Sequence, residues 1–267
     1  MKVLIVQNTV QKDIDKSLEN VTNLIEKRQE PSPDIIVLPE MFTTPYEVER
    51  FAAYAQTENG SVLTFLRDLA MTHKAYVIGG SVPEKHEGAL YNTTFIFNRE
   101  GNRIATYRKI HLFAITYPDG TRFDEAEVLC SGDELGLFET EFGTMGVMIC
   151  FDIRYPALAE RLVDKGAKAL FVPGAFNGFT GPLHWHTTFR ARATDNQAFM
   201  IGCSASADSF GSYETYGHSL VADPLGNVIA SLKGDEGIIE INVDLSRIDH
   251  ARSVLPIRAN KKALPDG

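Results

Sequence analysis

Three polar residues follow short apolar runs, at the positions where buried strands are expected to end. Glu40 comes directly after Ile35–Leu38 and Pro39, and Cys150 directly after Val147–Ile149. Lys109 follows an alternating segment that ends near Tyr107. A thiol, a carboxylate and an ammonium can act as nucleophile, proton acceptor and positive donor to a developing oxyanion. Together they would suffice for nucleophilic catalysis without a metal.

Each of the three also has an ordinary structural interpretation. A helix is expected to begin near Pro156, so Cys150 would lie in a tight strand-to-helix turn that resembles a nucleophile elbow. A helix end and a neighbouring cation would favour its thiolate. Taken singly, a cysteine is more often a packed core residue, and we interpret Cys130 and Cys203 in that way. A glutamate or lysine after a strand is often only a solvated surface residue.

The elements that would position these residues form an α/β pattern. Buried strands are predicted at Val3–Val6, Ile35–Leu38, Tyr76–Ile78, Val147–Ile149, Leu170–Val172 and Phe199–Ile201. Helices are predicted at Ile14–Lys27, Ser61–Thr72, Pro156–Lys165 and Pro182–Gln197, the last two with proline in the first turn. Hairpins are predicted within Tyr91–Tyr107 and Tyr216–Ser231. The pattern indicates a mixed sheet protein.

The whole chain sets limits on the class of function. It has 267 residues, 44% of them hydrophobic, and no linker or repeat, so we expect one domain spanning residues 1–267. The net charge of −9 argues against nucleic acid or an anionic membrane as the main partner. Three cysteines suggest free thiols in a reducing compartment, and no signal or membrane segment is evident, so the cytoplasm is expected.

Motifs for other chemistries are missing from the sequence. It has no Gly-x-Ser-x-Gly elbow, no phosphate-binding glycine-rich loop and no Cys-x-x-Cys pair, so a serine hydrolase or a nucleotide-dependent enzyme is not supported. His184 and His186 are the closest histidine pair. Residues two apart on a helix point to different faces, so we expect no shared metal.

The three stretches around these polar residues resemble, in order and separation, the signature motifs of the nitrilase superfamily of carbon–nitrogen hydrolases. They are Leu38-Pro39-Glu40, Tyr107-Arg108-Lys109-Ile110-His111-Leu112-Phe113 and Gly146-Val147-Met148-Ile149-Cys150-Phe151-Asp152-Ile153-Arg154-Tyr155-Pro156. The resemblance runs from Val3 to about Lys261. It implies a four-layer αββα sandwich, no cofactor or metal, and a Glu-Lys-Cys catalytic set. It also implies association through a helical face as a homodimer or larger homo-oligomer.

The resemblance assigns a role to each catalytic residue. Glu40 takes the thiol proton and Cys150 attacks an amide carbonyl. Lys109 and the backbone N–H of Phe151 hold the oxyanion, and ammonia leaves behind a thioester that water hydrolyses. A further family acid, which orients the site, falls on Glu125, although an exposed loop acid is an equal interpretation of that residue.

Within the superfamily the sequence is most similar to the omega-amidase branch, whose members act on 2-oxoglutaramate and 2-oxosuccinamate. The stretches Glu40–Tyr46, Pro173–Pro182 and His184–Asn196 carry this similarity. It implies that Arg154 binds the substrate carboxylate that is not attacked, that Tyr46 and Thr180 donate hydroxyl hydrogen bonds, and that Phe176 walls the pocket. Two departures from the pattern, Ala114 and the loop Asp119–Asp124, concern the pocket mouth.

Several alternatives remain open from the sequence. The substrate could be another linear amide, such as deaminated glutathione or an N-carbamoyl compound, and a nitrile is less favoured. The chain could instead be a non-catalytic binding or scaffolding protein of the same fold. A Cys-His-acid triad in which His111 or His184 serves as base is a third hypothesis.

Overall fold

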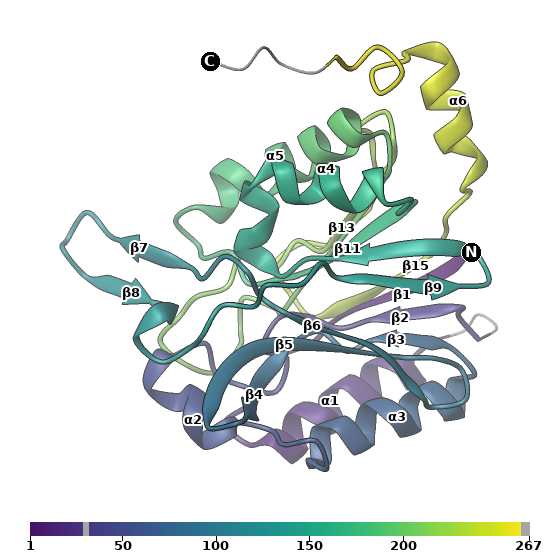
Figure 1. The fold of residues 1–267 in the computed structure, drawn as a ribbon. Coiled ribbons are helices and arrows are strands. Elements are labelled where there is room, and N and C mark those ends of the chain that lie inside the picture. The colour runs from purple at the N-terminus through teal and green to yellow at the C-terminus, as the bar shows by residue number, and fades with distance from the viewer. Residues whose placement is uncertain (29–31, 263–267) are drawn as a thin grey trace.

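The computed structural model describes residues 1–28 and 32–262 and contains two large sheets (Figure 1). The first has seven strands in the order β15-β1-β2-β3-β5-β4, with β6 beside β5. The second has six strands in the order β14-β13-β12-β11-β10-β9, and a separate small sheet pairs β7 with β8. In both large sheets three neighbouring strands are parallel, and antiparallel strands complete the edges.

The predicted apolar runs correspond to β1, β2, β3, β10, β11 and β12, whereas β4, β7, β8, β9 and β15 were not predicted. In the first sheet the strands are β1 Lys2–Gln7, β2 Ile35–Val37, β3 Tyr76–Ile78, β4 Val82–His86, β5 Ala89–Phe97, β6 Arg103–Arg108 and β15 Gly237–Asn242. In the second they are β9 Leu137–Thr140, β10 Gly143–Val147, β11 Ala169–Gly174, β12 Phe199–Ser204, β13 Leu220–Ala222 and β14 Val228–Ser231. The small sheet is β7 Ala114–Thr116 and β8 Arg122–Asp124. Both predicted hairpins are present, as β5–β6 and β13–β14.

The helices lie outside the two sheets (Figure 1). They are α1 Ile14–Glu26, α2 Phe51–Tyr54, α3 Ser61–His73, α4 Pro156–Asp164, α5 Gly181–Asn196 and α6 Ser246–Val254. Short 3-10 turns are η1 Val48–Arg50, η2 Glu125–Glu127 and η3 Cys150–Arg154. The helices α1 and α3 cover the first sheet, and α4 and α5 cover the second. The layers therefore run α–β–β–α, which confirms the predicted four-layer sandwich.

Alternation along β1 shows why the central strands are apolar throughout. Val3 and Ile5 belong to the core between the two sheets, and Leu4 and Val6 pack with the layer of α1 and α3. Successive side chains of a strand point to opposite faces, and here both faces are covered. A continuous apolar run is therefore what this position requires.

Two predictions about cysteine-bearing segments were wrong. β10 ends at Val147, two residues before the predicted end at Ile149, because the chain leaves the ladder and enters η3 at Cys150. Cys130 is exposed instead of packed in the core, because it lies in the loop after η2. Cys203 is buried as predicted, and its thiol donates to the carbonyls of Val6 and Val37.

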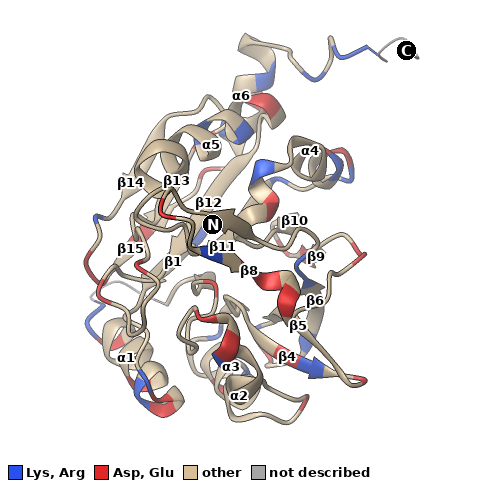
Figure 2. Cartoon of the chain, turned by 90° about the vertical axis from the view of Figure 1, so that its left-hand side faces the viewer, with Lys and Arg blue, Asp and Glu red and all other residues tan. Residues whose placement is uncertain are grey.

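Charges are spread over the molecule. On the side shown in Figure 2, acidic and basic residues are interspersed along the helices and loops. Within the described residues, no helix is both long enough and apolar enough to cross a membrane.

Candidate active site

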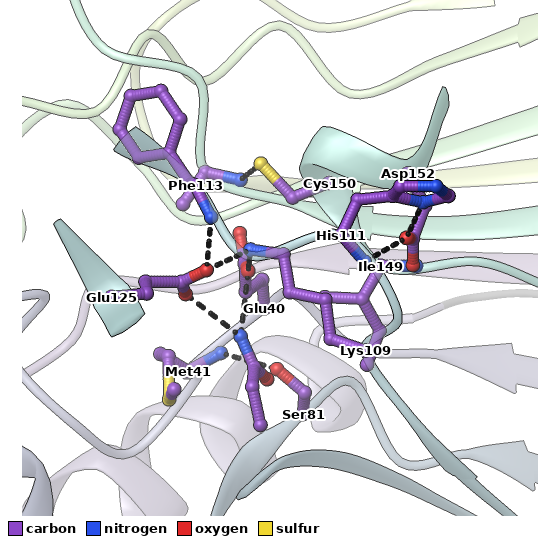
Figure 3. A network of polar contacts seen from close by, with 12 residues as sticks. Glu40, Met41, Ser81, Lys109, His111, Phe113, Glu125, Ile149, Cys150 and Asp152 are labelled. Carbon is purple, nitrogen blue, oxygen red and sulfur yellow. Dashed lines mark hydrogen bonds and ion pairs between the residues drawn. The ribbon is translucent and has the colours of Figure 1, made fainter. Parts of the chain in front are cut away.

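The ends of three strands bring Glu40, Lys109 and Cys150 together between the two sheets (Figure 3). Glu40 follows β2, Lys109 follows β6, and Cys150 follows β10 after two further residues. Close packing fixes the first of these exits. Gly80, at φ +57°, lies beside Pro39, and a Cβ at this glycine would stand 2.1 Å from the Pro39 carbonyl oxygen. The hydroxyl of Ser81 then accepts a hydrogen bond from the Met41 N–H at 3.1 Å.

Lys109 lies between two carboxylates. Its Nζ is 2.8 Å from Glu40 Oε1 and 2.8 Å from Glu125 Oε2, and all three side chains are 0% exposed. Glu125 is therefore a buried member of the cluster, and the interpretation of it as an exposed loop acid was wrong. It begins η2, directly after β8, and its Oε2 also accepts from the Phe113 N–H at 2.7 Å.

Neutral donors complete the cluster. The Tyr46 hydroxyl donates to Glu125 Oε1 at 2.8 Å and lies 3.3 Å from Glu40 Oε1. Asn92 Nδ2 lies 2.8 Å from Glu40 Oε1 and 3.2 Å from Glu125 Oε1. These bonds hold both carboxyl groups and the ammonium in one fixed arrangement, because buried polar networks of this kind leave little freedom to their members.

Burial and charge shift the pKa values of the cluster in different directions. Burial raises the pKa of Glu40, and the neighbouring Glu125 carboxylate adds to the rise while Lys109 opposes it. For the Lys109 ammonium, burial alone would lower the pKa, but Glu125 and Glu40 outweigh it and raise the pKa above its usual value. Lys109 is therefore a permanent positive charge, and Glu40 is suited to exchange a proton.

Cys150 begins η3 with a left-handed backbone, φ +47°. This conformation is rare for a non-glycine residue and matches the sharp turn of a nucleophile elbow. Its sulfur accepts a hydrogen bond from the Ala175 N–H at 3.4 Å. Burial raises the pKa of the thiol well above its usual value and the Glu40 carboxylate raises it further, although Lys109 and Ala175 lower it. Burial and Glu40 therefore oppose the effect of the helix end and the cation, which were expected to favour the thiolate.

Asp152 ties the turn of Cys150 to the segment that carries Lys109. Its buried carboxylate accepts from the Ile149 N–H at 3.0 Å, from the His111 N–H at 2.9 Å and from the Tyr107 hydroxyl at 2.7 Å. It also lies 2.8 Å from His111 Nδ1. The His111 ring is thus held against Asp152 (Figure 3). Within the described part of the chain, neither His111 nor His184 hydrogen-bonds to the sulfur of Cys150.

A small cavity opens beside Cys150. Its lining residues are Phe113, Cys150, Phe151, Arg154, Ala175, Phe176, Asn177, Thr180 and Tyr213. Arg154 is the one charged side chain among the described residues that line it. The guanidinium carbon of Arg154 lies 4.5 Å from the centre of the Phe176 ring, and Nη1 is 3.0 Å from His184 Nδ1. Arg154, which was predicted to bind the substrate carboxylate, and Phe176, which was predicted to wall the pocket, thus border the same cavity as the Cys150 sulfur.

Three other residues predicted at the substrate site, Phe151, Thr180 and Tyr46, differ in how well their positions fit their predicted roles. Phe151 lines the cavity and follows Cys150 in η3, where the first backbone N–H groups of a helical turn have no acceptor within that turn. Thr180 also lines the cavity, but its hydroxyl lies 2.9 Å from Asn177 Oδ1 and donates to it. The Tyr46 proton points to Glu125, so its role as a donor to substrate stays a prediction.

A wider cleft leads away from this cavity. It has a volume of about 690 Å³ and shares Asn177 and Tyr213 with the cavity beside Cys150. The β7–β8 hairpin forms one side of it through Tyr117–Asp119 and Thr121–Phe123. The divergent loop that the sequence placed at the mouth of the pocket does border this cleft.

The similarity to known proteins extends over nearly the whole chain. Residues 2–253 match the model of the carbon-nitrogen hydrolase family. The chain belongs to that family. The omega-amidase NIT2 of Xenopus tropicalis is 38% identical over 261 residues, which cover 98% of this chain and 95% of that protein. Omega-amidase NIT3 of Saccharomyces cerevisiae is 38% identical over 254 residues, which cover 92% of this chain and 87% of that protein.

A solved structure of the nitrilase superfamily also matches nearly the whole chain. The crystal structure of Saccharomyces cerevisiae Nit3, a member of branch 10 of the nitrilase superfamily, has a TM-score of 0.88 at 36% identity. The match covers 96% of this chain and 94% of that one. The predicted membership of the nitrilase superfamily and similarity to omega-amidases are confirmed. The protein is a carbon–nitrogen hydrolase, as the sequence predicted.

Sequence reasoning missed several residues at the site of this carbon–nitrogen hydrolase. Asn92 lies within β5, and asparagine is uncommon inside strands, so its position there is a signal that could have identified it. Asp152 was part of a motif but had no assigned role. Ala175 contributes a backbone N–H, and Tyr213 comes from a loop without regular structure, so neither had a signal in the sequence.

The two histidines of α5 have separate surroundings in this hydrolase. His184 faces Arg154, and the ring of His186 lies 6.0 Å from that of His218 and 6.5 Å from that of Tyr216. Within the described residues, no group of three or more His, Cys, Asp or Glu side chains is arranged to hold a metal ion.

Proposed function

We propose that this hydrolase removes the terminal amide of a small carboxylate, a 2-oxo-dicarboxylic acid monoamide, through a thioester on Cys150. The single observation that carries this proposal is one small cavity bordered by both a cysteine and a guanidinium. Cys150 lies next to the buried pair Glu40 and Lys109, and Arg154 supplies the positive charge. A short substrate can therefore place its amide at the sulfur and its carboxylate at the arginine.

Acylation begins with the neutral thiol. Glu40 takes the thiol proton as the Cys150 sulfur attacks the amide carbonyl carbon, and a carbon–sulfur bond forms. The negative charge moves to the former carbonyl oxygen, where Lys109 Nζ and the Phe151 N–H stabilise it. Glu40 then gives the proton to the amide nitrogen, the carbon–nitrogen bond breaks and ammonia leaves. The product of this half-reaction is a thioester with the acyl group on Cys150.

Deacylation repeats these steps with water. The Glu40 carboxylate takes a proton from water as the oxygen attacks the thioester carbonyl, and the same oxyanion donors act again. The intermediate expels the Cys150 sulfur, which receives the proton back from Glu40. The carboxylic acid product leaves, and one water is consumed for each ammonia released.

The charge at Arg154 supports an oxo acid over an amino acid as substrate. The guanidinium offers two parallel donors to a carboxylate, and the remaining wall is largely aromatic or apolar. An α-ammonium group beside the carboxylate would be brought close to this cation and would lose its water against apolar rings. A 2-oxo group carries no charge and avoids both costs. Burial lowers the pKa of Arg154, but arginine stays charged at neutral pH.

The relatives and the outer cleft favour the same substrates. Two relatives that are 38% identical over more than nine-tenths of the chain are omega-amidases. A larger polyanionic amide, such as deaminated glutathione, would extend into the outer cleft. Four acids, Glu47, Glu49, Asp119 and Glu214, border that cleft with one cation, Arg122, so the excess of negative charge would repel further carboxylates.

The family resemblance also underlies our expectations about assembly and location. We expect a homodimer or a larger homo-oligomer formed through a helical face, and a cytoplasmic location. The three cysteines support a reducing compartment, because none of them forms a disulfide in the structure.

The test is ammonia release by the purified protein from 2-oxosuccinamate, 2-oxoglutaramate, glutamine, asparagine and N-carbamoyl-β-alanine. We expect kcat/KM for the oxo acids to exceed that for glutamine by at least about tenfold, since one unfavourable charge contact is worth that much. Carbon dioxide would accompany ammonia only with the carbamoyl compound. Equal rates for 2-oxoglutaramate and glutamine would contradict the substrate proposal.

Two variants test the mechanism. Cys150→Ala should abolish turnover and prevent acylation detectable by mass spectrometry. Glu40→Gln should lower kcat by about 10² to 10⁴, the usual contribution of a positioned acid–base group. Glu127→Gln is a matched control, because Glu127 is exposed in η2. Near-normal turnover of Glu40→Gln would instead favour a histidine as base.

A further inference from the structure

A second small cavity lies next to Glu40. The residues that line it are Val10, Glu40, Met41, Thr44, Tyr46, Ala175, Ala205, Ser209, Phe210, Tyr213 and Thr215. Cys150, Arg154 and Phe176 line the other cavity and are not among the residues that line this one. Glu40 and Cys150 thus border different cavities.

Ala175 and Tyr213 line both cavities. The Tyr213 hydroxyl donates to the Ala175 carbonyl at 2.7 Å, and the Ala175 N–H donates to the Cys150 sulfur at 3.4 Å. These bonds hold the two shared residues beside Cys150. Burial raises the pKa of the Tyr213 hydroxyl well above its usual value, and Cys150 and Glu40 add to the rise, so all three groups are neighbours.

Polar atoms at this second cavity have unused hydrogen-bonding capacity. Thr44 Oγ1 is buried and has no hydrogen-bond partner among residues 1–28 and 32–262. Glu40 Oε2 also lacks a partner of normal geometry there, but the Glu40 carboxylate interacts with the Cys150 thiol as well. Thr44 and Glu40 are each only 1% exposed. Ser209 Oγ accepts from the Val10 N–H at 3.0 Å and has a proton left to donate. Buried polar groups are normally paired with protein or with ordered water, so these atoms point to a small polar ligand.

The size of the cavity fits one water molecule. The volume open to the centre of a water molecule is about 10 Å³, the same as for the cavity beside Cys150 in the absence of substrate. A site needs roughly 10–15 Å³ by this measure, and two to four polar partners, to hold one water. Glu40, Thr44 and Ser209 supply those partners. Phe210 is 40% exposed and Ser209 is half-buried, so the cavity also reaches the surface.

The geometry points to a water site behind Glu40 that supplies the hydrolytic water from the side opposite the substrate. This inference rests on the proposed function. The water is held by Thr44 Oγ1 and Glu40 and moves to the acyl carbonyl once ammonia has left. There it loses its proton to Glu40, its oxygen bonds to the carbonyl carbon, and the carbon–sulfur bond to Cys150 breaks. The sulfur then regains the proton from Glu40, so the step needs no other reactant.

A supply of water through the second cavity would allow deacylation while the acyl group fills the substrate cavity. The acyl group of the thioester occupies the space between Cys150 and Arg154, which leaves little room for water to pass. Water that arrives past Ser209 and Phe210 meets the carboxylate that must activate it. Hydrolysis then does not require the acyl group to move.

The test compares Thr44→Val with Thr43→Val in the full-length protein. Both residues are buried threonines with an unpartnered hydroxyl, but Thr44 lines this cavity and Thr43 does not. Valine has the same shape as threonine, so each substitution replaces one hydroxyl with a methyl group and changes little else. Rapid-quench kinetics with 2-oxosuccinamate measures acylation as the first turnover of ammonia, and decay of the isolated acyl-enzyme measures deacylation. Mass spectrometry measures the fraction of Cys150 that carries the acyl group.

We expect Thr44→Val to slow deacylation about tenfold, the effect of losing one hydrogen bond to the reacting water, with acylation changed less than twofold. The acyl-enzyme should accumulate in this variant and not in Thr43→Val. Equal slowing of both steps, or equal effects of the two substitutions, would overturn the water site. If no amide gives ammonia that depends on Cys150, the proposed function itself fails and the water site fails with it.

Two further measurements do not depend on the stability of Thr44→Val. A high-resolution crystal structure of the wild-type protein should show a water within hydrogen-bond distance of Thr44 Oγ1 and a Glu40 oxygen, and an empty cavity would refute the inference. Ala205→Val adds two methyl groups to a residue in the cavity wall that is 2% exposed. It should also slow deacylation selectively, and a normal deacylation rate with the cavity filled would overturn the proposal.

Discussion

Replacing Lys109 by methionine tests whether the site depends on balanced buried charge. Methionine keeps most of the length of the side chain and removes the ammonium. The ammonium lies 2.8 Å from Glu40 Oε1 and 2.8 Å from Glu125 Oε2, and none of the three side chains is exposed. Two carboxylates and one ammonium give the cluster a formal charge of −1. In Lys109→Met this charge becomes −2 inside the protein.

The expected loss of stability depends on pH. Removing one partner from a buried ion pair typically costs about 3–5 kcal/mol, and we expect this loss in the free energy of unfolding at pH 8. Without the ammonium, the two neighbouring carboxyl groups have pKa values in the folded variant above the unfolded value of about 4.3. The folded variant therefore binds a proton that the unfolded chain does not bind. The difference from wild type should shrink as the pH falls toward the unfolded pKa.

Urea unfolding of both proteins at pH 8 and at pH 5.5 measures this difference. The double variant with Lys109→Met and Glu125→Gln returns the cluster to −1 and should regain part of the lost stability at pH 8. It should not regain activity, because the oxyanion donor is still missing, which costs about 10² to 10³ in kcat. A loss that is the same at both pH values, or no recovery in the double variant, would refute the charge-balance reasoning.

Three more substitutions separate other roles at the site. Arg154→Met should raise KM for 2-oxosuccinamate by at least about tenfold, because this substrate has a carboxylate for Arg154 to bind. The neutral amide butyramide has no carboxylate, so its kcat/KM should stay within about twofold. Equal effects on the two substrates would exclude carboxylate binding by Arg154. The Asp152 carboxylate meets four hydrogen-bond donors, and Asp152→Asn replaces one of its oxygens with an NH₂ group that is itself a donor. We expect the free energy of unfolding, measured in urea, to fall by about 1–3 kcal/mol. Asp13→Asn, an exposed helix cap of equal quality, is its control and should change stability by less than about 0.5 kcal/mol. Tyr46→Phe should lower kcat with KM unchanged if the hydroxyl serves only to hold Glu125, whereas a rise in KM would show that it contacts substrate.

The elements of the fold were predictable because local sequence and tertiary environment agree. The apolar runs that became β1, β2 and β3 are buried on both faces, so their composition reports their position directly. Proline in the first turns of α4 and α5 marked where both helices begin. The assembly of these elements into two facing sheets was not predictable from periodicity, and it came from the family resemblance.

The site was predictable only where residue type alone indicates chemistry. Glu40, Lys109 and Cys150 each follow a strand, and the structure brings all three together. The left-handed turn at Cys150 and the burial of Glu125 depend on packing between segments far apart in the chain, which no local pattern records. The raised pKa of the Cys150 thiol has the same origin. Its pKa is raised by burial and by Glu40, and these outweigh the ammonium that sequence reasoning emphasised.

A neutral resting thiol is consistent with the charge of the cluster. With Cys150 protonated, Glu40, Glu125 and Lys109 together carry −1, and a thiolate would add a second uncompensated charge in a buried site. In the proposed mechanism the proton moves from sulfur to Glu40 during attack, while a negative charge appears on the substrate oxygen near Lys109. The total remains −1, because the charge lost at Glu40 is gained at the oxyanion. The ammonium therefore stabilises whichever of the two is negative, and the nucleophile becomes reactive only when a carbonyl is present to accept the charge.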